Sequence, residues 1–325
     1  MDEILVSINC ITYNHEKYIG DAIESFLMQK TNFAFEILIH DDASTDKTQD
    51  IIRDFAGKYP VIIKSILQKE NQYSKGIERI DYKFNFLRAK GKYIALCEGD
   101  DYWTDPYKLQ KQVDYMENNF KCGMCFHATQ IFRVGKGNIG VIKPYNESCI
   151  SSTDDIILGG GGFIGTNSIL YRKKILDNVP NFYMNAPVGD YALQILASTQ
   201  DYAYYVNEIM SVYRDGVEGS WSSSMTPEKN KEEVIFFNKR TIEMLYELNE
   251  YSNGKYFEVI NKRILLGEFE ILKIEKKIKQ IRARKYKTIY DCLGTKEKIK
   301  IYIKCIFPNT YKKLCYINRY IKEKL

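Results

Sequence analysis

Long hydrophobic runs, a secretory leader and proline-rich stretches are all missing from this sequence of 325 residues. No apolar run approaches the roughly 18 residues that a transmembrane helix needs. The first residues, Met1 to Ile4, have neither the basic start nor the apolar core of a secretory signal. We therefore expect a cytoplasmic protein.

Proline and tryptophan are scarce, with 7 and 2 residues, whereas tyrosine and phenylalanine are plentiful, with 26 and 16. This composition excludes collagen-like, disordered and low-complexity chains, because those lack the apolar and aromatic side chains of a packed core. The length is sufficient for one large domain, alone or with an appendage.

Charge is distributed unevenly along the chain. Residues 262–325 carry 19 Lys and Arg against 6 Asp and Glu, whereas residues 1–261 carry 28 against 36. A basic tail on an acidic body suggests that the tail faces an anionic partner while the body does something else.

Apolar strand patterns alternate with amphipathic helix patterns through the first hundred residues. The predicted strands are 4–11, 35–39, 61–67 and 93–97, and the predicted helices include 16–29, 74–89 and one starting at 105–106. This order predicts an α/β fold, with a doubly wound, mostly parallel sheet and helices on both faces. From about residue 228 the pattern is helical, so we expect domains at 1–224 and 225–325.

Two predicted strands end in acidic clusters, Asp41 and Asp42 after one and Glu98, Asp100 and Asp101 after the other. Parallel strands bring their carboxyl ends to one sheet edge, where ligands bind. Crowded carboxylates repel one another unless a cation lies among them, and hard oxygen ligands suit Mg²⁺ or Mn²⁺ with phosphate oxygens. The clusters therefore predict a metal–diphosphate site, the alternative being helix caps and turn residues.

Three segments in this order resemble the motifs of family 2 glycosyltransferases with the GT-A fold. They are Val6 to Asn14 (VSINCITYN), Glu36 to Asp46 (EILIHDDASTD) and Tyr93 to Pro106 (YIALCEGDDYWTDP). The resemblance covers about residues 4–222. It implies that Thr12 and Asn14 border a nucleotide pocket, and that Asp41 or Asp42 contacts the base.

The third segment resembles the DxD motif, with Glu98 in place of its first aspartate. By this resemblance Glu98 faces the ribose or sugar, Asp100 binds Mn²⁺ or Mg²⁺, and Asp101 supports the loop. The segment with Arg214 and Trp221 resembles the part that closes over donor and diphosphate, but it lacks the histidine that many members carry there. Arg214 is expected to pair with diphosphate or to form a structural ion pair, and Trp221 to stack on a sugar or to pack.

Asp190 lies where the resemblance places the general base, at the start of a predicted helix. In an inverting transfer a carboxylate takes the proton of the acceptor hydroxyl as it attacks the anomeric carbon. The alternative for Asp190 is a helix N-cap, which the apolar residues after it favour.

Gly160 to Gly165 (GGGFIG) formally matches a dinucleotide-binding fingerprint, which requires a helix directly afterwards. The residues that follow, Asn167 to Tyr171, have a strand pattern instead, so we reject a dinucleotide site. By the resemblance, Thr166 to Ser168 lie near the transferred sugar or the acceptor.

The basic tail, residues 262–325, has three interpretations. In the first, it is a solvated helical face over an apolar seam, with a dimer contact. In the second, it is an amphipathic anchor on the inner membrane face. In the third, it binds nucleic acid. Nucleic acid is the least favoured, because no base-stacking or groove-reading motif is present. We place the membrane anchor first.

The resemblance thus implies an inverting glycosyltransferase that moves a sugar from a nucleoside-diphosphate donor, expected to be a UDP-sugar. The acceptor would be a hydroxyl of a glycan or a lipid-linked acceptor in surface-polysaccharide synthesis. Two alternatives stay open: a non-catalytic nucleotide-sugar-binding or scaffold protein, and a nucleotidyltransferase on a similar sheet. The latter needs a basic, Gly-rich phosphate loop after the first strand, and Thr12 to His15 is not one.

Overall fold

The structure is a computed structural model that describes residues 3–307. Contacts divide the chain into two compact units, Met1–Ser224 and Met225–Leu325. Among the described residues, no helix has the length and apolar character needed to span a membrane. Each unit is considered by itself below.

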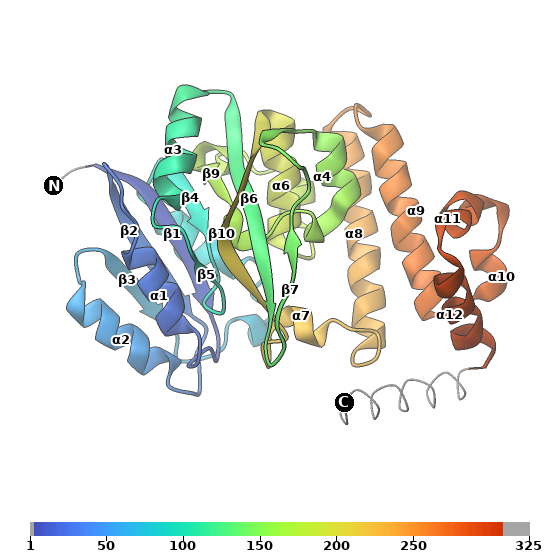
Figure 1. The fold of residues 1–325 in the computed structure, drawn as a ribbon, viewed down its shortest axis with the longest axis horizontal. Coiled ribbons are helices and arrows are strands. Elements are labelled where there is room, and N and C mark those ends of the chain that lie inside the picture. The colour runs from blue at the N-terminus through green and yellow to red at the C-terminus, as the bar shows by residue number, and fades with distance from the viewer. Residues whose placement is uncertain (1–2, 308–325) are drawn as a thin grey trace. The chain divides into compact units, whose positions relative to one another are not determined.

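The N-terminal unit is built on a single mixed sheet with the strand order β3-β2-β1-β4-β9-β6-β10-β5 (Figure 1). Two further strands lie off this path, β7 on β6 and β8 on β10. The strands are β1 Ile4–Thr12, β2 Ala34–Asp41, β3 Ile63–Leu67, β4 Tyr93–Leu96, β5 Tyr102–Trp103, β6 Cys122–Arg133, β7 Gly137–Ile142, β8 Cys149–Ser151, β9 Leu170–Arg172 and β10 Tyr202–Asp215.

The predicted α/β architecture is confirmed, with one refinement. Strands β1 to β4 pair in parallel, as expected from their alternation with helices. In the second half of the sheet β10 pairs in parallel with β6, but β9, β7, β5 and β8 pair antiparallel with their neighbours. The sheet as a whole is therefore mixed, because short antiparallel strands join its second half without crossover helices.

Both faces of the central strand are covered. Val6, Ile8 and Cys10 of β1 are fully buried in a core cluster with apolar residues of the helices α1, α2 and α3. The opposite face presents Ser7 and Asn9, which are also buried. The helices of this unit are α1 Ile19–Leu27, α2 Thr48–Lys58, α3 Lys108–Asn118, α4 Thr153–Gly159, α5 Asn181–Met184, α6 Gly189–Gln200 and α7 Trp221–Ser224.

The predicted helix over 74–89 forms only in its second half, and there as π-helical and 3-10 turns rather than as a regular α-helix. This segment contains two short 3-10 turns and a π-helical stretch, Asp81–Asn85, which contacts β1 and β2. Gly76 and Arg79 have positive φ angles of 78° and 58°, which interrupt a helix. Asn85 is fully buried and donates from Nδ2 to Asn9 Oδ1, at 2.8 Å. Tertiary hydrogen bonds thus replace the regular helix.

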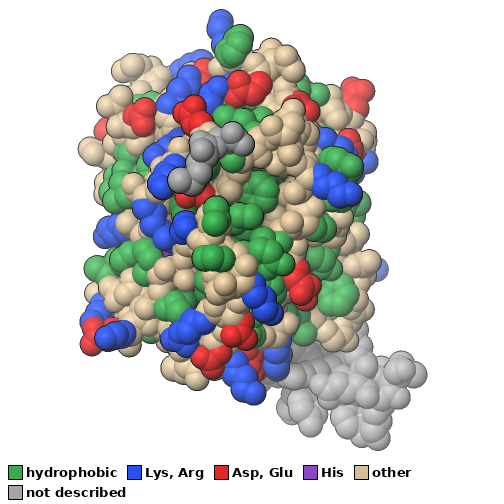
Figure 2. All heavy atoms as spheres, turned by 90° about the vertical axis from the view of Figure 1, so that its left-hand side faces the viewer, with side chains coloured by type: hydrophobic (Ala, Val, Ile, Leu, Met, Phe, Trp, Pro, Cys, Tyr) green, Lys and Arg blue, Asp and Glu red, His purple; other side chains and the backbone are tan. Residues whose placement is uncertain are grey.

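One edge strand of the sheet is β3, and Figure 2 shows the molecule from that side. Basic and acidic side chains are intermixed over this face, with apolar patches between them. Lys64 is exposed on the edge strand itself, which discourages pairing with a strand of another chain. No field of one sign dominates this face.

The second unit is helical in its described part. Its helices are α8 Lys231–Tyr251, α9 Phe257–Ile274, α10 Ile278–Ile281, α11 Lys287–Cys292 and α12 Thr295–Ile306. A small core joins α9, α10 and α12, made of Phe269, Leu272, Ile281, Tyr286 and Ile301. Residues 308–325 of the predicted basic tail lie outside the described residues.

Arg172, at the end of β9, connects three elements through its buried guanidinium. It donates to the carbonyl oxygens of Cys122 and Met116, at 2.8 and 2.6 Å, and to the Tyr93 hydroxyl, at 2.8 Å. Replacing it with leucine removes one hydrogen bond from each of these acceptors in a buried place, and losing buried hydrogen bonds costs stability.

We predict that Arg172→Leu lowers the free energy of unfolding by about 2–4 kcal/mol. The matched control, Lys174→Ala, removes an exposed side chain whose ion pair with Asp201 spans 3.6 Å. This control should change stability by no more than about 0.5 kcal/mol. Urea unfolding followed by circular dichroism measures both, and equal stability of the two variants would contradict the bridging role.

Candidate active site

The two acidic clusters meet at the carboxyl end of β1. In the strand register Thr12 lies opposite Asp41, and the Asp42 amide donates to the Thr12 carbonyl at 3.0 Å. On the other side of β1, the Gly99 amide donates to the Ile11 carbonyl at 2.9 Å. The sheet therefore places both clusters at one edge, as predicted from the strand order.

Asp41 and Asp42 use their carboxylates to fix loops. Asp41 Oδ1 accepts hydrogen bonds from the Ser44 amide at 3.0 Å and from Gln49 Nε2 at 2.6 Å. The two oxygens of Asp42 accept the amides of Gln72 and Tyr73, at 2.8 and 3.0 Å. Both aspartates are buried. Through these contacts they fix the loops at the carboxyl end of β1 and β2.

Asn14 links the turn after β1 to the turn after β2. Its Oδ1 accepts the Thr45 amide at 2.8 Å, and its own amide donates to Ser44 Oγ at 2.8 Å. Asn14 adopts a left-handed conformation, with φ of 55°, which asparagine tolerates better than most residues. Thr12 is buried beside this turn, with Oγ1 3.1 Å from His15 Nδ1.

Glu98 is surrounded by other carboxylates. Its side chain keeps an exposed surface. Desolvation by the protein around it, together with the charges of Asp100, Asp190 and Asp81, raises the pKa of Glu98 to about 8. Acids from three separate segments thus act on one carboxyl group, which is the electrostatic signature of a site that takes a cation.

Asp101 supports the loop. Its Oδ2 accepts Asn167 Nδ2 at 3.0 Å, and its Oδ1 accepts the Arg214 amide at 2.8 Å. Burial, and next the charge of Asp100, raise the pKa of Asp101 well above its ordinary value. These contacts agree with the supporting role expected for the third acid.

Asp100 differs from its neighbours because, within residues 3–307, no donor hydrogen-bonds to its carboxylate. The side chain is 9% exposed, and Nε2 of the His15 imidazole lies 3.8 Å from Oδ2. A carboxylate held in this way fits a metal ligand, since a divalent cation would supply the missing partner. The described residues contain no cluster of three His, Cys, Asp or Glu arranged to hold a metal. Any ion at Asp100 therefore needs further ligands from substrate and water.

Arg214 forms a structural ion pair, one of its two predicted roles, and the other, a contact with diphosphate, stays a prediction. Its guanidinium is ion-paired with Asp21 and donates to the Asp100 carbonyl at 2.9 Å. It also stacks near the rings of Tyr102 and Tyr18, 4.4 and 5.0 Å from their centroids. Arg214 therefore fixes the backbone of the loop that carries Asp100.

Asp190 is the second residue of α6. The helix begins at Gly189, with Val188 as its N-cap, so the predicted alternative of an Asp190 N-cap is wrong. Asp190 Oδ2 accepts the Thr166 hydroxyl at 2.9 Å, and Oδ1 accepts the Tyr191 amide at 2.6 Å. Burial is the main cause that raises the pKa of Asp190 above its ordinary value. A half-buried, oriented carboxylate with a raised pKa suits proton abstraction.

The glycine-rich segment is no dinucleotide site. Gly160–Gly162 forms a 3-10 turn and Thr166–Ser168 another, so the helix that a pyrophosphate fingerprint requires is absent from this described segment. The strand predicted from Asn167 begins only at Leu170. The Asn167 side chain instead turns inward to Asp101, which explains the shorter strand.

Trp221 is the first residue of the short helix α7, and its side chain is 44% exposed. The segment before it is anchored by a hydrogen bond between the hydroxyls of Tyr213 and Ser222, at 3.0 Å. Both of the predicted roles for Trp221, stacking on a sugar and packing, remain predictions.

Three features of the site were not predicted from the sequence. They are the positions of His15 and Asp81, and the hydrogen bond between Thr166 and Asp190. His15 follows Thr12 by three residues in the turn after the central strand, so its position at the sheet edge was the available signal. Asp81 lies in the segment that was predicted to be a helix. Its influence on Glu98 depends on the tertiary fold.

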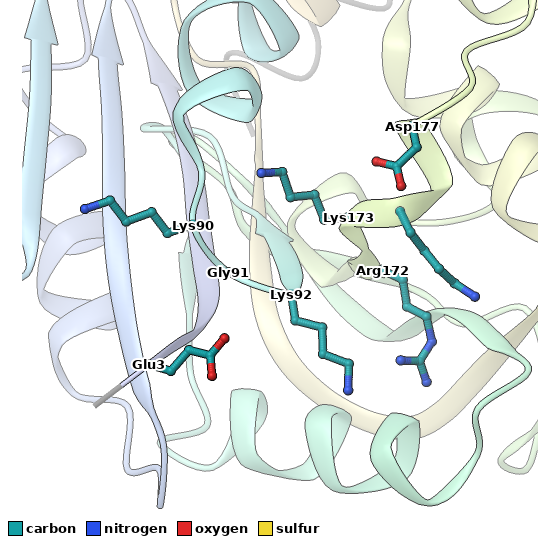
Figure 3. Close-up of a pocket in the computed structure, with 8 residues that line it drawn as sticks. Glu3, Lys90, Gly91, Lys92, Arg172, Lys173 and Asp177 are labelled. Carbon is teal, nitrogen blue, oxygen red and sulfur yellow. The ribbon is translucent and has the colours of Figure 1, made fainter. Parts of the chain in front are cut away.

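A separate pocket of about 370 Å³ lies at the opposite edge of the sheet, where β1 and β4 begin (Figure 3). It is lined by Glu3, Lys90, Gly91, Lys92, Arg172, Lys173, Lys174 and Asp177. Several of its basic side chains already have partners. Lys92 is ion-paired with Glu117 at 2.7 Å and Lys174 with Asp201 at 3.6 Å, and Arg172 donates to backbone carbonyl oxygens such as that of Met116. This pocket is remote from the acidic edge.

Comparisons with known proteins agree with this architecture. Residues 7–179 match the family model described as Glycosyl transferase family 2. An uncharacterized protein of Mycobacterium bovis is 36% identical over 222 residues, covering 68% of this chain and 62% of the relative. The chain thus spans about three fifths of the length of such relatives.

A second relative is the Escherichia coli enzyme WfaP, named a UDP-Glc:α-D-GlcNAc-diphosphoundecaprenol β-1,3-glucosyltransferase. It is 39% identical over 113 residues, covering 35% of this chain and 41% of the relative. Among solved structures, Staphylococcus aureus TarS 1–349 in complex with UDP-GlcNAc superposes with a TM-score of 0.60 at 15% identity, covering 93% of this chain and 80% of that 1–349 chain. That likeness shows the GT-A fold. The match to the family model covers more than half of the chain, and the chain belongs to glycosyl transferase family 2.

Proposed function

We propose that this protein is an inverting glycosyltransferase that uses a nucleoside-diphosphate sugar. The observation that carries the proposal is the convergence of Glu98, Asp100 and Asp190 at one sheet edge, expressed in the raised pKa of Glu98. A diphosphate with its cation relieves this repulsion, and a carboxylate beside it serves as base. Family membership supports the same chemistry.

Each of the three acids has a separate role in the proposed reaction. The acceptor hydroxyl oxygen attacks the anomeric carbon while Asp190 takes its proton. The bond between that carbon and the diphosphate oxygen breaks, and nucleoside diphosphate leaves from the opposite face. Asp100 would hold Mn²⁺ or Mg²⁺, which neutralises charge on the leaving diphosphate. Glu98, whose carboxyl group is affected by the charges of both other acids, is proposed to face the ribose or the sugar.

The donor is proposed to be a UDP-sugar. The E. coli relative is named for transfer from UDP-Glc to a lipid-linked GlcNAc, and TarS was solved with UDP-GlcNAc. The proposed acceptor is accordingly a hydroxyl of a glycan or of a lipid-linked sugar in surface-polysaccharide synthesis. Thr12, Asn14, Asp41 and Asp42 are proposed to border the nucleotide.

The basic region 262–325 is proposed to contact the inner membrane face, which would bring the enzyme to a lipid-linked acceptor. On α12, Ile299, Tyr302 and Ile306 are 52%, 44% and 43% exposed. Their spacing places them on one helical face, among lysines that would meet anionic lipid.

Metal-dependent donor binding tests the proposed site. We expect one nucleoside-diphosphate sugar from a panel to raise the melting temperature and to bind in calorimetry with Mn²⁺, but not with chelator. Asp100→Asn should abolish the metal-dependent component of donor binding, because it removes the charged ligand of the metal. Failure of every donor to bind well-folded wild-type protein would contradict the proposed function.

The base is tested by Asp190→Asn. We predict a fall in kcat of about 10²–10⁴-fold with donor affinity unchanged, because the amide cannot take the acceptor proton. Asp154→Asn is the matched control, since Asp154 is an exposed acid in the first turn of α4. Transfer kinetics and calorimetry measure both quantities. Unaltered kcat in Asp190→Asn would exclude its role as base.

Replacing Thr166 should shift the pH dependence of kcat/KM for transfer. Asp190 works when ionised, so kcat/KM rises with pH through its pKa, which burial holds above the ordinary aspartate value. The Thr166 hydrogen bond lowers that pKa, so Thr166→Val should move the acid limb of the profile to higher pH.

Ser168→Ala is the control for the Thr166 variant, because the Ser168 hydroxyl donates to the Gly165 carbonyl rather than to Asp190. Its acid limb should coincide with that of the wild type. A Thr166→Val profile that does not move, or moves to lower pH, would show that another group sets the limb.

A further inference from the structure

His15 is the imidazole that faces Asp100. It lies in the turn between β1 and α1, and its Nε2 is 3.8 Å from Asp100 Oδ2. The two side chains are 11% and 9% exposed, so this arrangement is nearly enclosed by protein. The separation is too long for a hydrogen bond. The two groups therefore face each other without a direct bond.

The orientation of His15 is fixed from several sides. Its Nδ1 lies 3.1 Å from Thr12 Oγ1, and its amide donates to Thr48 Oγ1 at 2.8 Å. Gly99 packs close to the same threonine, where only glycine fits, since a Cβ at this position would lie 2.5 Å from Thr12 Oγ1. An Nδ1–H that donates to Thr12 leaves the Nε2 lone pair directed at Asp100, which is the usual arrangement of a metal-binding histidine.

We propose that His15 Nε2 and the Asp100 carboxylate together bind the divalent cation of the donor complex. The inference rests on the proposed function, in which a metal accompanies the nucleoside diphosphate. Two ligands bound at about 2.1 Å to one ion lie at most about 4.2 Å apart, so 3.8 Å is within the reach of a single cation. His15 thereby supplies the nitrogen ligand that the segment around Arg214 lacks.

The other two histidines of the chain are engaged elsewhere. His40 stacks on Phe84, with ring centroids 4.4 Å apart, and its Nε2 lies 3.2 Å from Gln68 Nε2. His127 is buried on β6, with Nδ1 2.9 Å from the Ala128 carbonyl. With three histidines in the sequence, a nitrogen signal from a bound metal can be assigned by single substitutions.

Pulsed electron paramagnetic resonance of Mn²⁺ tests the proposal on the unaltered protein. Full-length protein is mixed with UDP and a sub-stoichiometric amount of Mn²⁺, once with natural histidine and once with ¹⁵N-histidine. We expect a histidine nitrogen coupling to the bound Mn²⁺ that changes with the isotope. It should vanish in His15→Gln and persist in His40→Gln, the matched control.

Affinity provides the second measurement. His15→Ala should weaken Mn²⁺ binding to the UDP complex by about 10–100-fold. Mg²⁺ binding should change less, because Mg²⁺ prefers oxygen ligands. Circular dichroism and thermal melting confirm that the variant is folded.

Two negative results are distinguishable. UDP and Mn²⁺ that bind together without histidine nitrogen coupling would overturn the role of His15 and leave the proposed function intact. Absence of any metal-dependent UDP or UDP-sugar binding in folded wild-type protein would overturn the proposed function, and the metal role of His15 with it.

Discussion

The candidate site depends on the buried carboxylate of Asp101. One oxygen accepts the Asn167 side chain, and the other accepts the backbone amide of Arg214. Asn167 follows Thr166, whose hydroxyl orients Asp190, while the Arg214 guanidinium holds the carbonyl of Asp100. A single desolvated acid thereby joins the segment of the proposed base to the loop of the proposed metal ligand. Its burial is tolerated because both oxygens are hydrogen-bonded.

Electrostatic repulsion is the second constraint. Glu98 and Asp100 of one loop interact electrostatically with Asp190 of another segment, and no lysine or arginine forms an ion pair with any of them in the described part of the chain. Arg214, which donates to the Asp100 carbonyl, is ion-paired with Asp21 instead. Burial raises the pKa of both Glu98 and Asp190, and the charges of Asp100 and Asp190 raise that of Glu98 further. A cationic ligand is favoured because it relieves this repulsion.

The general architecture could be predicted from the sequence because the local strand and helix patterns agree with it. Strand periodicity located β1, β2 and β4, and the shared edge of parallel strands predicted that the acids of Asp41 and Glu98 would meet. The irregular form of segment 73–88 could not be predicted, because the Asn85 side chain donates hydrogen bonds to β1 and β2, which lie far from it in the sequence. Long-range contacts overrode its local helical pattern.

Side-chain partners in the site were the hardest to foresee. Arg214 and Asp21 are ion-paired across 193 positions of sequence, and no spacing rule connects them. The contact between His15 and Asp100 likewise exists only once β1 and β4 are paired. The sequence shows which residues carry charge. Only the folded structure shows which of them support the loop and which are available to a ligand.

The stereochemistry of transfer tests the central claim most directly. Many transferases slowly hydrolyse their donor, so proton NMR can follow the anomer of the sugar released from the nucleoside-diphosphate donor, before mutarotation, without knowledge of the acceptor. The account predicts that the first anomer formed has the configuration opposite to that of the donor, because Asp190 activates a nucleophile on the face away from the diphosphate. Release of the retained anomer would contradict it.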